Sequence, residues 1–196
     1  LRPGHVRPDP KLRINTGAKG ILKMGGVGGG KVLVWQTIQG HWSGQLAADM
    51  YTNVVAKAVK KRYPGKRSFT VLEDNDPTGN RSKSGLDAKR QCKLHVLEIP
   101  KRSPDLNVLD YAIWSEVEKR LRDQEKAFPK TKKETRQAFE HRLDRVAREL
   151  PKSFIDDAIG NMYERSQLLY EAQGGLFQEG SISERTKLAN KRARRA

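Results

Sequence analysis

The stretch Ser68-Phe69-Thr70-Val71-Leu72-Glu73-Asp74, followed by Asn75-Asp76-Pro77-Thr78-Gly79, decides the fold of this chain. Its first part is apolar and β-branched at the centre, which predicts a short buried strand. Its second part is built from residue types that favour tight turns. We therefore expect the Asp74 carboxylate to emerge at the carboxyl edge of a sheet, where chemistry gathers in α/β proteins.

Strands and helices alternate on both sides of this strand. β-branched apolar runs predict strands, and apolar residues at helical spacing predict amphipathic helices. In chain order the elements are strand, strand, helix, strand, helix, strand and helix, which predicts an α/β sheet domain. They cover 31–38, 45–48, 49–63, 68–74, 83–92, 94–99 and about 107–122, with the first two strands forming a hairpin.

The composition changes toward both ends of the chain. Residues 1–30 are rich in Pro and Gly and predict an extended arm and a Gly-rich loop. Residues 31–128 form the predicted core, and 129–176 predict C-terminal helices. Residues 177–196 form a polar, basic tail. Because the chain opens at Leu1, without an initiator Met or an apolar signal segment, we expect it to begin inside a longer parent.

The charge balance favours a polyanionic partner. The 196 residues include 39 Lys and Arg against 23 Asp and Glu, a net charge of +16. Such a surface attracts nucleic acid. No apolar run approaches the roughly 18 residues of a spanning helix, so we expect no membrane partner. The single cysteine, Cys92, excludes an internal disulfide and a Cys-rich zinc site, which fits a reducing compartment.

Asp110 is the second candidate site residue. It lies on the apolar stripe of the helix predicted over about 107–122, four residues before Trp114, where an acid needs a partner. Two structural interpretations remain open. With Asn107 as N-cap, Asp110 would complete a capping box, and Asp74 would accept hydrogen bonds from amides of its own turn.

Both acids lie in motifs that resemble the signature of mariner-type DDE/D transposases. That family has D-N-x-P at its second catalytic carboxylate and S-P-D-L-N-x-x-E/D at its third, with a Trp four residues later. The matching residues are Asp74-Asn75-Asp76-Pro77 and, with 35 residues between the two acids, Ser103-Pro104-Asp105-Leu106-Asn107-Val108-Leu109-Asp110, then Trp114. The upstream residues Val34-Trp35, Ile38, Gly40, Gly44 and Leu46 resemble a strand pair of the family, so the resemblance covers about residues 25–122.

The resemblance implies a ribonuclease H-like mixed sheet flanked by helices, with a C-terminal helical extension. It also implies carboxylates that hold two Mg²⁺ or Mn²⁺ ions for DNA cleavage and strand transfer, with transposon ends and target DNA as partners. Asp74 and Asp110 would be catalytic metal ligands, Asn75 would orient its loop, and Asn107 would support the helix that carries Asp110. Hard oxygen ligands suit Mg²⁺, and two ions suit phosphoryl displacement.

The chain also departs from the family pattern. The family's first catalytic Asp lies on a strand upstream, and residues 1–30 offer no acid on a predicted strand, because Asp9 stands between two prolines. Gln36 replaces a usual Gly, the His that commonly follows the D-N-x-P turn is missing, and Asp76 adds a carboxylate that could perturb a metal or cap the turn. The chain is therefore either a fragment lacking its first strand or a decayed or repurposed copy, and its own enzymatic activity is left open.

Basic residues supply candidate nucleic-acid contacts. Six of them cluster around the end of the helix predicted over 49–63, and two precede the second motif, where they would lie beside the carboxylates. They are Lys57, Lys60, Lys61, Arg62, Lys66, Arg67, Lys101 and Arg102. A solvated helix face is the alternative for the first six. The basic tail could be a nuclear address or a nucleic-acid arm, so we expect a nuclear protein in a eukaryote and a cytoplasmic one otherwise.

Three functional hypotheses follow. The first is the catalytic domain of a transposase, active in DNA cleavage and strand transfer within its complete parent, with a homodimer as one open assembly. The second is a transposase-derived DNA-binding or assembly protein without catalysis. The third is an unrelated basic component of a ribonucleoprotein or other large assembly. An upstream strand with an acid would separate the first two, and a sheet unlike that of ribonuclease H would favour the third.

Overall fold

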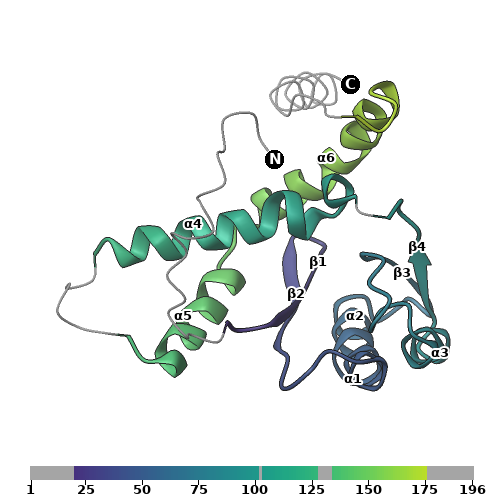
Figure 1. The fold of residues 1–196 in the computed structure, drawn as a ribbon, viewed down its shortest axis with the longest axis horizontal. Helices are drawn as coiled ribbons and strands as arrows, with labels where there is room; N and C mark the ends of the chain where they lie inside the picture. The colour runs from purple at the N-terminus through teal and green to yellow at the C-terminus, as the bar shows by residue number, and fades with distance from the viewer. Residues whose placement is uncertain (1–19, 102, 128–133, 176–196) are drawn as a thin grey trace, which may run out of the picture.

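The computed structural model describes residues 20–101, 103–127 and 134–175 (Figure 1). Most of the expected N-terminal arm, the basic tail and Arg102 therefore lie outside the described residues. The strands are β1 (Lys23–Gly28), β2 (Lys31–Thr37), β3 (Phe69–Leu72) and β4 (Leu94–Leu97). The helices are α1 (Gly44–Met50), η2 (Tyr51–Val55), α2 (Ala56–Arg62), α3 (Lys83–Gln91), η3 (Pro104–Leu106), η4 (Leu109–Ile113), α4 (Trp114–Glu125), α5 (Arg136–Arg148) and α6 (Lys152–Glu171).

The strands form two pairs of different kinds. β1 and β2 are antiparallel, whereas β3 and β4 are parallel, from Phe69 opposite Leu94 to Leu72 opposite Leu97. The parallel pair is joined by a crossover through α3, as parallel strands require. The predicted α/β class is confirmed, and the strand predicted over 68–74 is present as β3, which spans Phe69–Leu72.

Most of the Gly-rich segment is a strand, so the prediction of a loop was wrong for Lys23–Gly28, and only Gly29 and Gly30 form a turn. β1 pairs with β2 through backbone hydrogen bonds, which need no side chains. A Cβ atom on Gly25 would lie 2.8 Å from the Trp114 ring, so glycine allows α4 to pack closely on this strand. β1 therefore replaces 45–48 as the hairpin partner of β2.

Residues 45–48 form part of a helix instead of the expected strand. The Ser43 side chain accepts a hydrogen bond from the Leu46 amide at 3.3 Å and starts α1 there. α1, η2 and α2 then follow one another without a break, with Tyr51 and Ala56 in the α conformation. The predicted helix over 49–63 is thus real but begins one and a half turns earlier.

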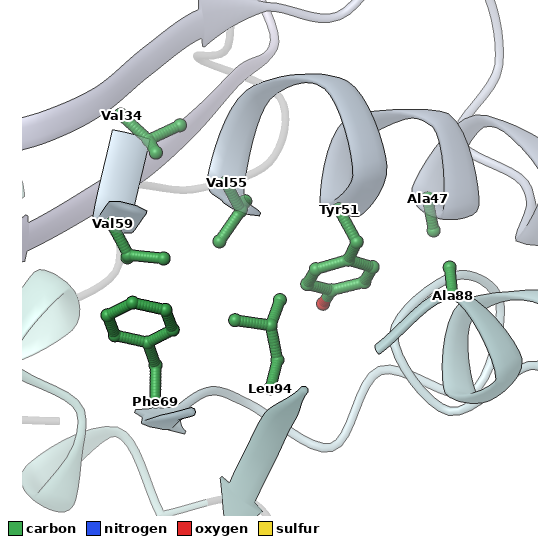
Figure 2. Close-up of a cluster of buried hydrophobic side chains, with 8 residues drawn as sticks. All are labelled: Val34, Ala47, Tyr51, Val55, Val59, Phe69, Ala88 and Leu94. Carbon is green, nitrogen blue, oxygen red and sulfur yellow. The ribbon is translucent and has the colours of Figure 1, made fainter. Parts of the chain in front are cut away.

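Two hydrophobic clusters lie on opposite faces of the β1–β2 hairpin. Val34 and Trp35 are both 3% exposed, and because neighbouring strand residues point to opposite faces, each belongs to a different cluster. The first cluster, shown in Figure 2, contains Val34, Ala47, Tyr51, Val55, Val59, Phe69, Ala88 and Leu94. The second contains Trp35, Ile113, Val117, Leu121, Val146, Ala147, Leu150 and Ile155.

The clusters divide the helices between the two sides of the hairpin. In Figure 1, β1 and β2 lie between α4 and α5 on one side and α1 to α3 with β3 and β4 on the other. Lys23 of β1 forms an ion pair with Asp144 of α5 at 2.5 Å. None of the helices in the described part of the chain is long and apolar enough to cross a membrane.

Candidate two-carboxylate site

Asp74 lies directly beyond the end of β3, on the solvent side of the chain. The preceding acid, Glu73, points inward, with 12% of its side chain exposed, whereas Asp74 is exposed. This difference follows from the alternation of side chains along an extended strand. One oxygen of Asp74, Oδ1, accepts a hydrogen bond from the Asn80 side-chain amide. Asn80 therefore fixes one carboxylate oxygen and leaves the other available to a ligand.

Asn80 is itself fixed by a network of buried polar groups. Lys89 is 1% exposed and donates to the Glu73 carboxylate and, at 2.7 Å, to the Asn80 backbone carbonyl. The Tyr51 hydroxyl lies 2.5 Å from Glu73 Oε2 and 3.0 Å from Asn80 Oδ1. Burial and the Glu73 charge raise the pKa of Tyr51 well above its usual range, so the hydroxyl keeps its proton. Figure 2 shows Tyr51 extending from its helix between Leu94 and Ala88.

Asn75 joins the turn after β3 to the loop after β4. Its amide donates to the Ile99 carbonyl at 2.7 Å, and its Oδ1 accepts from Arg81 Nη2 at 2.5 Å. Arg81 also pairs with Glu98 at 3.0 Å. The two parallel strands thus end in loops that hold each other in place.

Asp76 caps its turn. Its carboxylate accepts from the Gly79 amide at 2.8 Å, from the Thr78 amide at 3.2 Å and from the Trp42 indole at 2.7 Å. Although desolvation opposes ionisation, these hydrogen bonds hold the pKa of Asp76 below its usual value. Of the two roles expected for Asp76, the structure therefore supports the structural one.

Asp110 begins the long helix formed by η4 and α4. The backbone carbonyl of Asn107 accepts a hydrogen bond from the Asp110 amide at 2.9 Å. The side-chain Oδ1 of Asn107 accepts one from the Leu109 amide at 3.2 Å. The predicted N-cap, which is 8% exposed, is thereby confirmed. Desolvation and the charge of Asp74 raise the pKa of Asp110, and a hydrogen bond with the Asn107 side chain opposes that rise. The two acids, far apart in the chain, thus lie within electrostatic reach of each other.

A buried arginine of α6 supports the loop before Asp110. Arg165 is 5% exposed and donates to the Asp105 carbonyl at 2.8 Å. Its guanidinium lies 4.1 Å from the centre of the Tyr111 ring, and the Tyr111 hydroxyl donates to the Ala158 carbonyl at 2.6 Å. Burial raises the pKa of Tyr111 to about 12, although Arg165 acts against the rise. The C-terminal helix is therefore part of the framework of the site.

The donor set fits a hard divalent cation in part. Carboxylate oxygens are the ligands that Mg²⁺ and Mn²⁺ accept, and a cation would relieve the repulsion between Asp74 and Asp110. Within residues 20–101, 103–127 and 134–175, however, no three or more His, Cys, Asp and Glu side chains are arranged to hold a metal ion. The described residues thus provide two candidate ligands.

The six basic residues expected to contact nucleic acid are all exposed, at the other end of β3. Tyr51, at the start of η2, contacts Glu73 just after β3 ends. Tyr63, just after α2 ends, packs on Phe69, where β3 begins. The six basic residues, which follow one another from the first turn of α2 to just beyond Tyr63, therefore extend away from Asp74. Lys101 is exposed in the loop after β4.

The sequence interpretation missed the groups that hold the two acids. Lys89 shares a buried stripe with Gly85 and Ala88 of α3, and Arg165 shares one with Ala158 and Leu168 of α6. A cation on the apolar stripe of a helix indicates a buried ion pair or a buried hydrogen bond. That signal was available in both helices.

Comparison with known proteins gives sequence relatives, among them the Tcb1 transposase of Caenorhabditis briggsae at 27% identity over 158 residues, and a group of structures. No protein-family model matches the chain. The chain is 27% identical over 159 residues to the transposable element Tc1 transposase of Caenorhabditis elegans, across 75% of this chain and 54% of the relative. It therefore spans about half the length of that relative.

Solved structures of Mos1 transposase share the fold. The catalytic domain with Raltegravir and Mg has a TM-score of 0.66 at 16% identity and covers 81% of this chain and 77% of that one. The paired-end complex with the left transposon end has a TM-score of 0.68 at 18% identity and covers 91% of this chain and 50% of that one. These likenesses support the ribonuclease H-like fold. In sequence the chain is thus similar to a Tc1 transposase, and in fold it is similar to the catalytic domain of Mos1 transposase.

Proposed function

We propose that the complete parent of this domain carries out metal-dependent DNA cleavage and strand transfer, and that Asp74 and Asp110 are two of its metal ligands. One observation carries the proposal: burial and then the Asp74 charge raise the pKa of Asp110, so the two acids lie near each other although 35 residues separate them in the chain. Like charges held together in this way favour a bound cation.

The residues of this chain would prepare the site in stated ways. Asn80 holds one oxygen of Asp74, and Asn107 holds the first turn of the helix that carries Asp110. Asn75 fixes the loop between them and the end of β4. When bound, a pair of Mg²⁺ or Mn²⁺ ions supplies activation of the attacking oxygen and stabilisation of the leaving oxygen in phosphoryl transfer.

DNA is the proposed substrate. The Mos1 neighbours include a complex with a transposon end, and this chain carries a net charge of +16, which attracts a polyanion. Lys101 is exposed in the loop after β4, which Asn75 joins to the turn that carries Asp74, and this supports a phosphate contact by Lys101 and by Arg102, which follows it in sequence.

A metal titration tests the proposal on the chain as it exists. Mn²⁺ binding would be measured by electron paramagnetic resonance for the unmodified chain, Asp74→Asn and Asp110→Asn, with Asp123→Asn, an exposed acid of α4, as the matched control. Each site variant should bind Mn²⁺ at least about tenfold more weakly, because losing even an indirect partner of a metal costs about 10–100-fold. Equal binding by all four proteins would remove Asp74 and Asp110 from the metal site.

The second candidate function is that of a DNA-binding protein with the same fold but without cleavage or strand transfer. It is favoured by the donor set, because the described residues offer two acids where the related transposases are expected to use three. A strand-cleavage assay on the longer parent, with the Asp110→Asn variant beside it, separates the two. Cleavage that the variant abolishes supports the enzyme, whereas metal-independent DNA binding without cleavage supports the binding protein.

A further inference from the structure

The surface cations of this domain are distributed unevenly. Residues 50–72 contain six Lys and Arg residues and no Asp or Glu. All six are exposed, and none forms an ion pair with another residue of the described ranges. We call this set the α2 basic surface: Lys57, Lys60, Lys61, Arg62, Lys66 and Arg67.

α4 shows what an ordinary solvated helix surface looks like in the same molecule. Its cations alternate with acids, and the ion pairs Arg120 with Glu116 and Arg122 with Glu118 join neighbouring turns at 2.7 and 2.5 Å. Such pairs neutralise the local field of a helix. The α2 basic surface has no such acids, so its positive potential extends into solvent.

The surface is also organised by its contacts. Lys57, Lys60 and Lys61 lie on the helix face opposite the buried Val55 and Val59. The Arg62 guanidinium donates to the Gly29 carbonyl in the β1–β2 turn at 2.9 Å. Arg62 and Lys66 lie 5.3 and 6.0 Å from the centre of the Tyr63 ring. The helix thus places the three lysines on one face, and the Tyr63 ring brings Arg62 and Lys66 together after the end of that helix.

This surface is distant from the carboxylates. Tyr51 reaches Glu73 beside Asp74, and Tyr63 packs on Phe69 at the opposite end of β3. The twelve-residue step from Tyr51 to Tyr63 corresponds to about 18 Å of helix. Along B-DNA, with a phosphate about every 3.4 Å on each strand, that separation is about five base pairs. The two surfaces therefore cannot hold the same phosphate.

We propose that the α2 basic surface is a separate binding site for the phosphate backbone of duplex DNA, which acts without metal and holds the duplex about half a turn from the carboxylates. The choice of DNA as the ligand rests on the proposed function. Lys and Arg contacts to phosphates release counterions and carry no sequence information, so this site binds duplexes of any sequence.

Two triple variants with the same change in net charge test the proposal. Lys57→Gln, Lys60→Gln and Lys61→Gln remove three charges from the α2 basic surface. Lys119→Gln, Arg122→Gln and Lys126→Gln remove three exposed charges from the α4 region. Binding to a fluorescent 25-base-pair duplex is measured by anisotropy in EDTA between about 50 and 200 mM salt, where affinity falls as a power of the salt concentration. All six positions are exposed, and thermal melting checks that each variant stays folded.

The expected results distinguish a site from net charge alone. The α2 triple variant should lower the slope of log affinity against log salt by about 2 to 3, because each lost phosphate contact contributes about 0.9. The α4 triple variant should change the slope by less than about 1. Equal losses in both variants, or no loss in the α2 variant, would overturn the proposal, as would tighter binding of an acidic peptide than of the duplex.

The experiment is independent of the metal chemistry. Because EDTA removes divalent ions, failure of the metal titration leaves the DNA result intact. Asp74→Asn and Asp110→Asn should retain the salt slope of the unmodified chain if the two sites are separate. A clearly higher duplex affinity in either variant, because a carboxylate no longer repels a neighbouring phosphate, would place the phosphate contacts at the carboxylates and contradict the separation.

Discussion

The loops that carry Asp74 and Asp110 are each held by one buried cation, but the two cations work differently. Lys89 neutralises a carboxylate, Glu73, in the first hydrophobic cluster. Arg165 donates to a backbone carbonyl at 2.8 Å and stacks on the Tyr111 ring beside the second cluster. The first loop therefore depends on a charge balance, and the second on the shape and hydrogen-bonding geometry of a guanidinium.

This difference predicts how each loop fails. A buried ion pair that loses one partner leaves an uncompensated charge, which costs more than the pair itself contributes. Replacing the Arg165 guanidinium removes the hydrogen bond, the ring contact and an ion pair with Asp105 at 3.8 Å, but the Asp105 side chain is 46% exposed, so its charge stays in contact with water. Removal of Lys89 should therefore destabilise the domain more than removal of Arg165. At Arg165, however, even the conservative change to lysine should be destabilising.

Lys89→Met should have the largest effect on stability. The change removes the cation that pairs with the Glu73 carboxylate beside Tyr51, and we expect the free energy of unfolding to fall by about 3–5 kcal/mol. Urea denaturation measures it, with Lys83→Met, an exposed lysine of the same helix, as the control. Adding Glu73→Gln to Lys89→Met should restore much of the loss. A double variant as unstable as the single one would show that Lys89 acts through packing and not through charge.

Arg165→Met should have a smaller effect, which Arg165→Lys should repeat. Loss of the hydrogen bond to the Asp105 carbonyl and of the contact with Tyr111 should lower the free energy of unfolding by about 2 kcal/mol. Lysine cannot donate to the carbonyl and stack on the ring in the same geometry, so it should recover little. Arg122→Met, with 70% of the arginine side chain exposed, is the control for urea denaturation. Full recovery by lysine would contradict the geometric role.

The sequence predicted the elements better than the contacts between them. The β3 strand, the Asp74 turn and the Asn107 cap are local patterns, and all three are present. β1 was missed because glycines normally break strands. Here a glycine is needed at position 25, because the Trp114 ring packs against it. Residues 45–48 were misassigned because four residues cannot distinguish helix from strand by periodicity.

The supports of the site were missed for a different reason. Glu73 and Lys89 are neighbours only after β3 and α3 have packed, and Asp105 and Arg165 meet across 60 residues of chain. Nothing in the local pattern pairs these residues. A buried stripe that contains a cation identifies one partner, but the fold must supply the other.

Asp110→Asn should stabilise the domain slightly, and the size of this gain should depend on pH. Desolvation and the Asp74 charge raise the pKa of Asp110, so the folded chain binds this proton more tightly than the unfolded chain. Ionised Asp110 therefore opposes folding above its raised pKa, and this cost disappears as pH falls below the pKa of an unfolded Asp. Asn carries no charge, so Asp110→Asn should melt higher than the unmodified chain at pH 7 and the two should converge near pH 3. A difference in melting temperature that is the same at both pH values would show that the gain does not come from the repulsion between the two carboxylates.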